Sequence, residues 1–415
     1  MSGLRDSIRD MEPAPYIKDF RHFRTFSEVN EILRSKDFRQ GSHQESQPFF
    51  GNSLLTIDHD DHFERRRLEA SLFSKAALEY YEREELVPLI QQTLDEARSA
   101  GGDVVRVDLC AVLRTILARI SAVTTGIDGV DTPERTDAFR DYVEELSIGV
   151  GVEWSTEDHA EVVARILAIR DDFDRDFFSA SLQRRRDLVQ RHREGHLARE
   201  DLPVDLLTLL LLHWDDGWDA EFPIREAALY LVAASQTTTH ALPHVVVHLS
   251  EWFAEHPEDR SKVKDKGFLK MAAHESLRLH LPAPALLRIA EADVVLTNGV
   301  TIAEGERVAC LVTPANRDPA VFGSDARSYN PYRETPDVKP WGFAFGGGQH
   351  SCIGRTLVTG LSPRTDDDDG TDGTLVNILS ALYAAGAELD PEDPPTYNPL
   401  TYHDAYGRFP LLLTR

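Results

Sequence analysis

Residues 345–355 read FGGGQHSCIGR, which places Cys352 inside a glycine-rich loop, directly before an apolar stretch that suits a helix. Metals bind the thiolate form of cysteine, and backbone N–H groups near a helix N-terminus stabilise that negative charge. Gly346, Gly348 and Gly354 allow the backbone to approach the sulfur and a flat ligand without Cβ clashes. The segment therefore indicates a thiolate that a loop presents to a metal.

The same segment matches the signature Phe-Gly-x-Gly-x-His-x-Cys-x-Gly at every fixed position. In this the chain resembles the cytochrome P450 family, and specifically its soluble bacterial-type heme-thiolate monooxygenases. The resemblance extends over residues 20–415 and implies that Cys352 is the thiolate ligand of the iron in heme b. A flexible glycine loop that happens to hold a cysteine is the alternative, and the motifs below argue against it.

A second motif is the helical pair Glu275 and Arg278, whose side chains share one face because they lie three residues apart. Alone, such a pair is usually a surface ion pair. Downstream, residues 329–333 (YNPYR) resemble the family's Phe-Asp-Pro-x-Arg element, whose arginine completes a buried network with the helix pair. By this resemblance Glu275, Arg278 and Arg333 are structural residues on the proximal side of the heme.

The two heme propionates require cations, which the family supplies from separate segments. By resemblance these are His62 and Arg66 of a His-x-x-x-Arg helix, Arg288, and His350 of the cysteine loop. Arginine suits this role because it binds carboxylates bidentately and stays charged when buried. For His62, a plain surface histidine beside three arginines is the alternative.

Residues 233–238 (AASQTT) fall where the family carries Ala-Gly-x-Asp/Glu-Thr-Thr on the helix that crosses the distal heme face. The resemblance gives Thr237 the role of holding oxygen and its water. Gln236 replaces the acid that relays protons, and an amide orients water without exchanging a proton at ordinary pH. Ala234 replaces a glycine, and Pro243 is expected to bend or end regular hydrogen bonding. His240 receives no role here, because a histidine packed elsewhere is the more common case.

The expected fold is mainly α with a small β region, the P450 fold, in a single domain over residues 1–415. Apolar residues recur at helical spacing in six segments, and residues 294–312 set β-branched residues around turns at Asn298-Gly299 and Glu304-Gly305. No repeat or Pro/Ser-rich linker divides the chain. The predicted helices are residues 78–99, 106–125, 132–148, 157–192, 223–250 and 267–280.

Composition narrows the setting. With 45 basic and 70 acidic residues the formal charge is −25, which argues against general binding to nucleic acid or anionic lipid. The longest strongly apolar stretch, residues 206–212, is too short to cross a bilayer, and the N-terminus lacks a signal peptide's apolar segment. Three scattered cysteines do not form a disulfide framework. We therefore expect a cytoplasmic protein with no membrane partner.

The resemblance implies O2 as co-substrate, ferredoxin and ferredoxin reductase as electron donors, and a small apolar organic substrate. Two alternatives remain: the same fold doing oxidative coupling, desaturation or peroxide-driven oxidation, which Gln236 motivates, and a non-catalytic heme sensor. Mutating a pocket candidate would report core packing equally well. The residues expected to line the pocket are Phe49, Phe50, Ala233, Ala285, Leu286 and Tyr402.

Residues 362–373 (SPRTDDDDGTDG) form an acidic loop that interrupts the helical stretch after Cys352. Like charges with glycine and proline predict a solvated loop. If it lies beside the surface where a redox partner docks, Asp366–Asp369 would repel an acidic ferredoxin. An inert insertion is the alternative.

Overall fold

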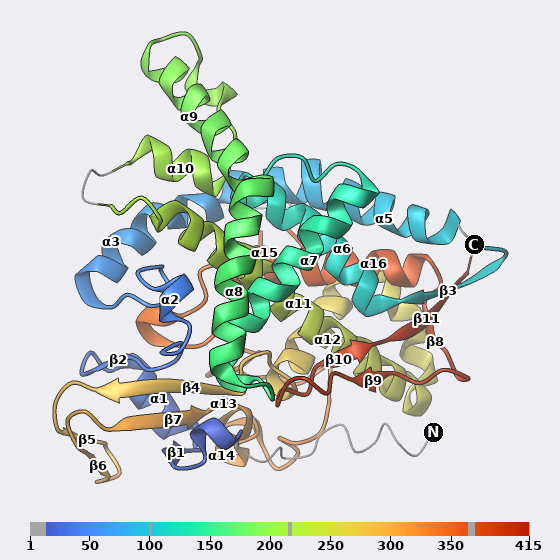
Figure 1. The fold of residues 1–415 in the computed structure, drawn as a ribbon. Coiled ribbons are helices and arrows are strands. Elements are labelled where there is room, and N and C mark those ends of the chain that lie inside the picture. The colour runs from blue at the N-terminus through green and yellow to red at the C-terminus, as the bar shows by residue number, and fades with distance from the viewer. Residues whose placement is uncertain (1–13, 100, 215–217, 364–369, 415) are drawn as a thin grey trace.

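The computed structural model describes residues 14–99, 101–214, 218–363 and 370–414. Its helices make up the larger part of the molecule, with small sheets below and behind them (Figure 1). This confirms the predicted fold class. The helices are α1 (Phe26–Arg34), α2 (Gln47–Phe50), α3 (His59–Glu69), α4 (Lys75–Tyr80), α5 (Val87–Ser99), α6 (Leu109–Thr125), α7 (Pro133–Val150), α8 (His159–Phe173), α9 (Ser179–Arg193), α10 (Leu206–Leu212), α11 (Phe222–Glu255), α12 (Lys266–Leu279), α13 (Val312–Ala315), α14 (Pro319–Phe322), α15 (Arg355–Thr359) and α16 (Thr374–Ala384).

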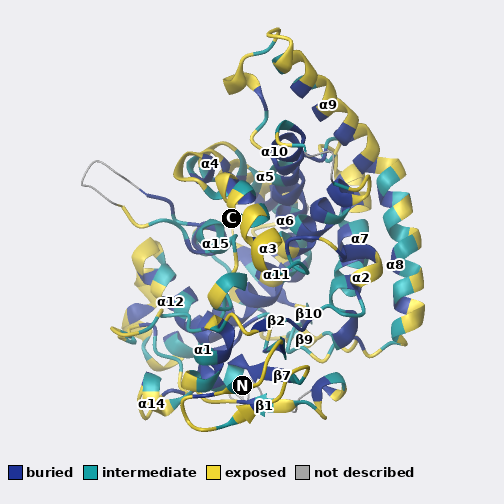
Figure 2. Ribbon diagram, turned by 90° about the vertical axis from the view of Figure 1, so that its left-hand side faces the viewer, coloured by how far each residue is buried: buried dark blue, intermediate teal, exposed yellow. Residues whose placement is uncertain are grey.

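The central element is α11, which lies in the middle of the molecule and is buried along most of its length (Figure 2). Leu242, Val245 and Leu249 pack into one apolar core together with residues of α6, α12 and α16. Ala227, Leu231 and Val232 pack into a second core with aromatic side chains of α7 and α8. A helix that is apolar on nearly all sides is expected to be surrounded by protein in this way.

Two sheets join segments that are far apart in sequence. One has the order β1-β7-β4-β2 and pairs residues 21–40 with residues 285–311, while the other has the order β3-β11-β8 and carries the C-terminal strand. Two further pairs, β5-β6 and β9-β10, complete the β region. The strands are β1 (Arg21–Phe23), β2 (Phe38–Gln40), β3 (Val104–Asp108), β4 (Ala285–Ala290), β5 (Val294–Val295), β6 (Thr301–Ile302), β7 (Arg307–Leu311), β8 (Glu388–Leu389), β9 (Thr396–Tyr397), β10 (Tyr406–Arg408) and β11 (Pro410–Thr414).

Some predicted boundaries are wrong. The helix predicted over residues 106–125 begins only at Leu109, because residues 104–108 pair with the C-terminal strand instead. The predicted helices 78–99 and 157–192 each contain a π-helical turn, at Tyr81–Leu86 and Asp174–Phe178. In contrast to the expectation for Pro243, α11 is assigned without interruption past that residue. Tertiary pairing and packing overrode the local pattern in these places.

The segment after Cys352 interrupts the helical stretch as predicted, since α15 ends at Thr359 and α16 begins at Thr374. Its two ends are joined: the Thr371 N–H donates to the Leu361 carbonyl at 3.0 Å, and the Leu361 N–H donates to Thr371 Oγ1 at 2.9 Å. The four aspartates Asp366–Asp369 lie outside the described residues.

Candidate active site

Cys352 closes the glycine loop, since its backbone N–H donates to the Phe345 carbonyl at 2.8 Å. The thiol is exposed, yet burial raises its pKa, while a hydrogen bond from the Gly354 backbone and the charge of Arg66 lower it. A side chain that is both accessible and surrounded by protein lines a recess. Gly348 has φ of +65°, and a Cβ there would clash with the Leu33 carbonyl, so this glycine serves the packing of the loop on α1.

An open strip runs along the middle of α11. Ala233 and Thr237 are exposed and Tyr230 is half-buried, whereas residues 226–229 before the strip and 238–249 after it are buried. Because the strip is flanked by buried turns at both ends, it faces an internal space. Ile353, next to Cys352, packs against the core that includes α11 residues 227–232, so the cysteine loop borders the same part of the helix. The recess and the strip together give room for a flat ligand between loop and helix.

The predicted cationic residues gather beside the cysteine loop. The imidazole rings of His62 and His350 lie 4.3 Å apart, and Arg66 Nη2 donates to Ser351 Oγ at 3.5 Å. Burial, with the neighbouring charges of His350 and Arg66, lowers the pKa of His62 to about 4. His62 is therefore neutral at physiological pH and offers a hydrogen bond, not a charge.

The remaining members are joined through Asp58, which the sequence prediction missed. His350 Nε2 lies 2.8 Å from Asp58 Oδ1, and the Gln40 N–H donates to the same oxygen at 2.9 Å. Arg288, buried on β4, donates to Gln40 Oε1 at 3.1 Å. Burial raises the pKa of Asp58, but the bonds from His350 and Gln40 outweigh it and hold the pKa below its ordinary value.

Asp58 shows what these donors bind. His350 is directed at a carboxylate, the chemical group of a heme propionate, so the donor set fits a carboxylated ligand. A signal was present in the sequence, because Asp58 stands directly before the helix of the His-x-x-x-Arg motif, at its N-cap. The two other histidines of this stretch turn elsewhere: His43 Nδ1 lies 3.2 Å from the Val150 carbonyl, and His59 Nε2 lies 3.1 Å from Glu291 Oε1.

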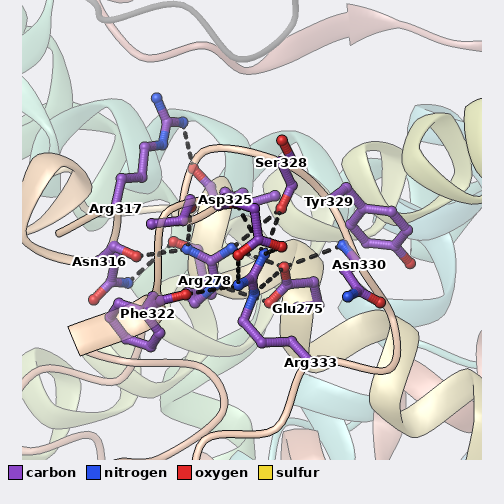
Figure 3. A network of polar contacts seen from close by, with 12 residues as sticks. Glu275, Arg278, Asn316, Arg317, Phe322, Asp325, Ser328, Tyr329, Asn330 and Arg333 are labelled. Carbon is purple, nitrogen blue, oxygen red and sulfur yellow. Dashed lines mark hydrogen bonds and ion pairs between the residues drawn. The ribbon is translucent and has the colours of Figure 1, made fainter. Parts of the chain in front are cut away.

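On the other side of the loop, Glu275, Arg278 and Arg333 meet in one buried network (Figure 3). Arg278 donates to both oxygens of Glu275, at 2.8 and 2.7 Å, and Arg333 Nε donates to Glu275 Oε1 at 2.9 Å. Arg278 Nη1 also donates to the carbonyls of Asn316 and Ala326 at 2.7 Å. The network thus joins α12 to the segment that leads toward the cysteine loop.

The comparisons with known proteins agree with this arrangement. The family model described as Cytochrome P450 matches residues 31–359. The chain belongs to the cytochrome P450 family. It is 24% identical to the "Putative cytochrome P450 YjiB" and 25% identical to the "Biotin biosynthesis cytochrome P450", both of Bacillus subtilis (strain 168), over 85% and 84% of this chain and 82% and 77% of theirs. The crystal structure of P450BioI in complex with an acylated acyl carrier protein has the same fold, with a TM-score of 0.70, 18% identity and coverage of 99% and 97%.

Membership of this family makes the protein a heme-thiolate monooxygenase with heme b as its cofactor. In this P450, Cys352 is the residue that would ligate the iron, and His62, Arg66, Arg288 and His350 lie where the cofactor's carboxylates would be held. In the described part of the chain no helix is both long and apolar enough to span a membrane.

The predicted pocket residues of this P450 are not in one environment. Ala233 lies on the open strip, and Leu286 is half-buried beside Gly346 of the cysteine loop. Phe49 and Phe50 are fully buried with their rings 5.0 Å apart and belong to the core around α7 and α8. Ala285 is buried in a separate small core, and Tyr402 is exposed. Ala233 and Leu286 are thus the two that border the recess.

Proposed function

We propose that this P450 inserts one oxygen atom from O2 into a small apolar organic substrate, with electrons from a ferredoxin and a ferredoxin reductase. The observation that carries the proposal is the open strip of α11, where Ala233 and Thr237 are exposed in a helix that is otherwise buried. An exposed alanine beside a hydroxyl inside the molecule offers an apolar wall and one polar group to whatever binds there.

The roles of the chain's own residues follow from these positions. Bound heme supplies the reductive activation of O2, and Cys352 supplies the thiolate that favours O–O cleavage. Thr237 Oγ1 donates to the Ala233 carbonyl at 2.9 Å, which fixes its orientation and leaves its lone pairs for water or oxygen. Gln236 is half-buried beside it and orients water, while Ala233 and Leu286 position the apolar substrate.

A second function is favoured by one residue. Because Gln236 stands in place of a carboxylic acid, the proton delivery that accompanies O2 cleavage has no acid at that position. The same fold doing oxidative coupling, desaturation or peroxide-driven oxidation would depend less on that acid.

The test is an isotope experiment. A screen of purified protein for the spectral shift that accompanies displacement of iron-bound water identifies the substrate class. That substrate is then turned over with NADPH, ferredoxin and ferredoxin reductase under ¹⁸O2. The proposal requires one ¹⁸O atom in the product for each NADPH consumed productively. Product without the label, or product formed only with added peroxide, would establish the second function instead.

We further propose a cytoplasmic location. All three cysteines are free thiols, and two of them, Cys110 and Cys310, are buried, which suits a reducing compartment. Fractionation of cells that produce the untagged protein would test this, since recovery in a secreted or membrane fraction would contradict it.

A further inference from the structure

A cluster of histidines lies around Asp404, outside the residues discussed so far. His240 and His244 are one helical turn apart on α11 and are both buried, and Asp404 lies in the loop between β9 and β10. One possible ligand atom from each of the three lies within 4.8 Å of the others. Two imidazoles and one carboxylate are a ligand set that Zn²⁺ uses in proteins.

The first geometric argument concerns His240. Its Nε2 atom lies 3.1 Å from Asp404 Oδ1, yet it makes no hydrogen bond within the described residues. In a tetrahedral zinc site the ligand atoms lie about 2.0–2.2 Å from the ion and hence about 3.3 Å from each other, with their lone pairs directed at the ion. The separation of Nε2 and Oδ1, without hydrogen-bond geometry between them, matches this arrangement.

The second argument concerns His244. A carbonyl oxygen only accepts, so His244 Nε2–H donates to the Asp404 carbonyl, at 2.9 Å, and Nδ1 carries the lone pair. That Nδ1 is buried and makes no hydrogen bond to any described residue. A metal-ligating histidine usually donates its other ring N–H to a carbonyl or carboxylate in this way, which orients the ligand nitrogen.

His280 holds the remaining carboxylate oxygen. Its Nδ1 lies 2.7 Å from Asp404 Oδ2, and its ring stacks on that of His244 with centroids 4.2 Å apart. The carboxylate is therefore fixed from one side and keeps Oδ1 for a ligand. Asp404 is partly accessible, with 24% of its side chain exposed, which gives an ion a way in from the C-terminal loop.

We propose that His240, His244 and Asp404 form a binding site for a divalent transition-metal ion, Zn²⁺ by ligand type, that is separate from the heme iron. Three protein ligands leave the fourth tetrahedral position for water. A bound ion would tie α11, one turn beyond Thr237, to the C-terminal loop that carries Tyr402. The site would thereby hold this loop in place at the edge of the recess.

The experiment uses full-length, untagged, heme-loaded protein and zinc chloride. Chelator competition should give one tightly bound zinc per chain, and zinc K-edge absorption should show two imidazoles and oxygen ligands at about 2.0–2.2 Å. His244→Ala and Asp404→Ala should each lower the zinc affinity by about 100-fold or more. The matched control is His248→Ala, a buried histidine one turn further along α11 that is bonded to Ser276 Oγ at 2.9 Å, and it should leave the affinity unchanged.

The proposal is overturned if the wild-type protein binds no zinc more tightly than the His244→Ala variant does. It is equally overturned if the absorption spectrum of the wild-type protein lacks two imidazoles. The spectrum is recorded on unaltered protein, so the decision stands even where a variant fails to fold.

Discussion

Cys352 is the residue on which the chemistry depends most directly. We predict that Cys352→Ser removes the long-wavelength Soret band of the reduced, CO-bound protein, because a serine hydroxyl is far harder to ionise than a thiol. Cys310→Ala is the matched control, since Cys310 is buried on β7 and should leave the band in place. A wild-type protein that is fully loaded with heme and lacks the band would contradict thiolate ligation.

Thr237 and Gln236 carry a separate prediction about protons. Thr237→Ala should increase the peroxide released per NADPH, because the hydroxyl on the open strip no longer holds water or oxygen. Gln236→Glu should raise the share of NADPH recovered in product, since a carboxyl group can relay a proton. Both variants should retain heme, and peroxide and product are measured together against NADPH consumed. If coupling is unchanged in both variants, proton delivery takes another route.

At the scale of single residues, the sequence was informative where a motif fixes spacing and uninformative where the fold sets the neighbours. The motifs named Glu275, Arg278 and Arg333, which the structure brings together, while their role in the enzyme stays a prediction. Asp58 and Asp404 were missed. Their partners lie 292 and 124 residues away along the chain, at His350 and His280, and no local pattern specifies such contacts.

Among the elements, long helices could be predicted and short strands could not. The apolar repeat of residues 132–148 predicted α7 closely, because a helix of that length buries one continuous face. β1 and β2 have three residues each and are strands only because they pair with β7 and β4, some 250 or more residues later. A pattern of three residues does not distinguish a strand from a loop.

The ion-pair network that holds α12 has a measurable effect on stability. We predict that Arg278→Met lowers the free energy of unfolding by about 3–5 kcal/mol, because Glu275 loses two hydrogen bonds inside the protein. The control is Arg260→Met, which breaks an exposed pair with Glu388 and should cost at most about 1 kcal/mol. Urea denaturation of both variants measures the difference. Equal midpoints would show that the network is not needed to hold α12.

For the whole molecule, sheet pairing draws together segments from both ends of the chain. The sheet β1-β7-β4-β2 joins residues near the N-terminus to residues 285–311, and β3-β11 joins residues 104–108 to the C-terminal strand. These pairs support the predicted single domain, which stays a prediction. They also place the cysteine loop, α11 and the C-terminal loop in one body, so charge anywhere on the surface acts on one electrostatic field.

That field leads to a prediction about the redox partner, which rests on the proposed ferredoxin. The chain carries a net charge of −25, and an acidic ferredoxin approaching it is repelled within about one Debye length, roughly 8–10 Å at physiological salt. The acidic segment follows α15, the helix after Cys352, and its ends are joined at Leu361 and Thr371. Replacing Asp366–Asp369 with asparagine should therefore speed reduction by an acidic ferredoxin at low salt, with little change in melting temperature.

A second variant separates position from net charge. α7 lies on the opposite side of the molecule from α15 in Figure 2, and neutralising four exposed acids at its N-terminal half changes the net charge by the same amount. If the acidic segment acts locally, this variant should reduce at the wild-type rate, while the aspartate variant is faster at low salt and converges with the wild type as salt rises. Equal acceleration in both variants would assign the effect to total charge, and equal rates in all three proteins would make the segment an inert insertion. The four substitutions of the control are Asp131→Asn, Glu134→Gln, Asp137→Asn and Asp141→Asn.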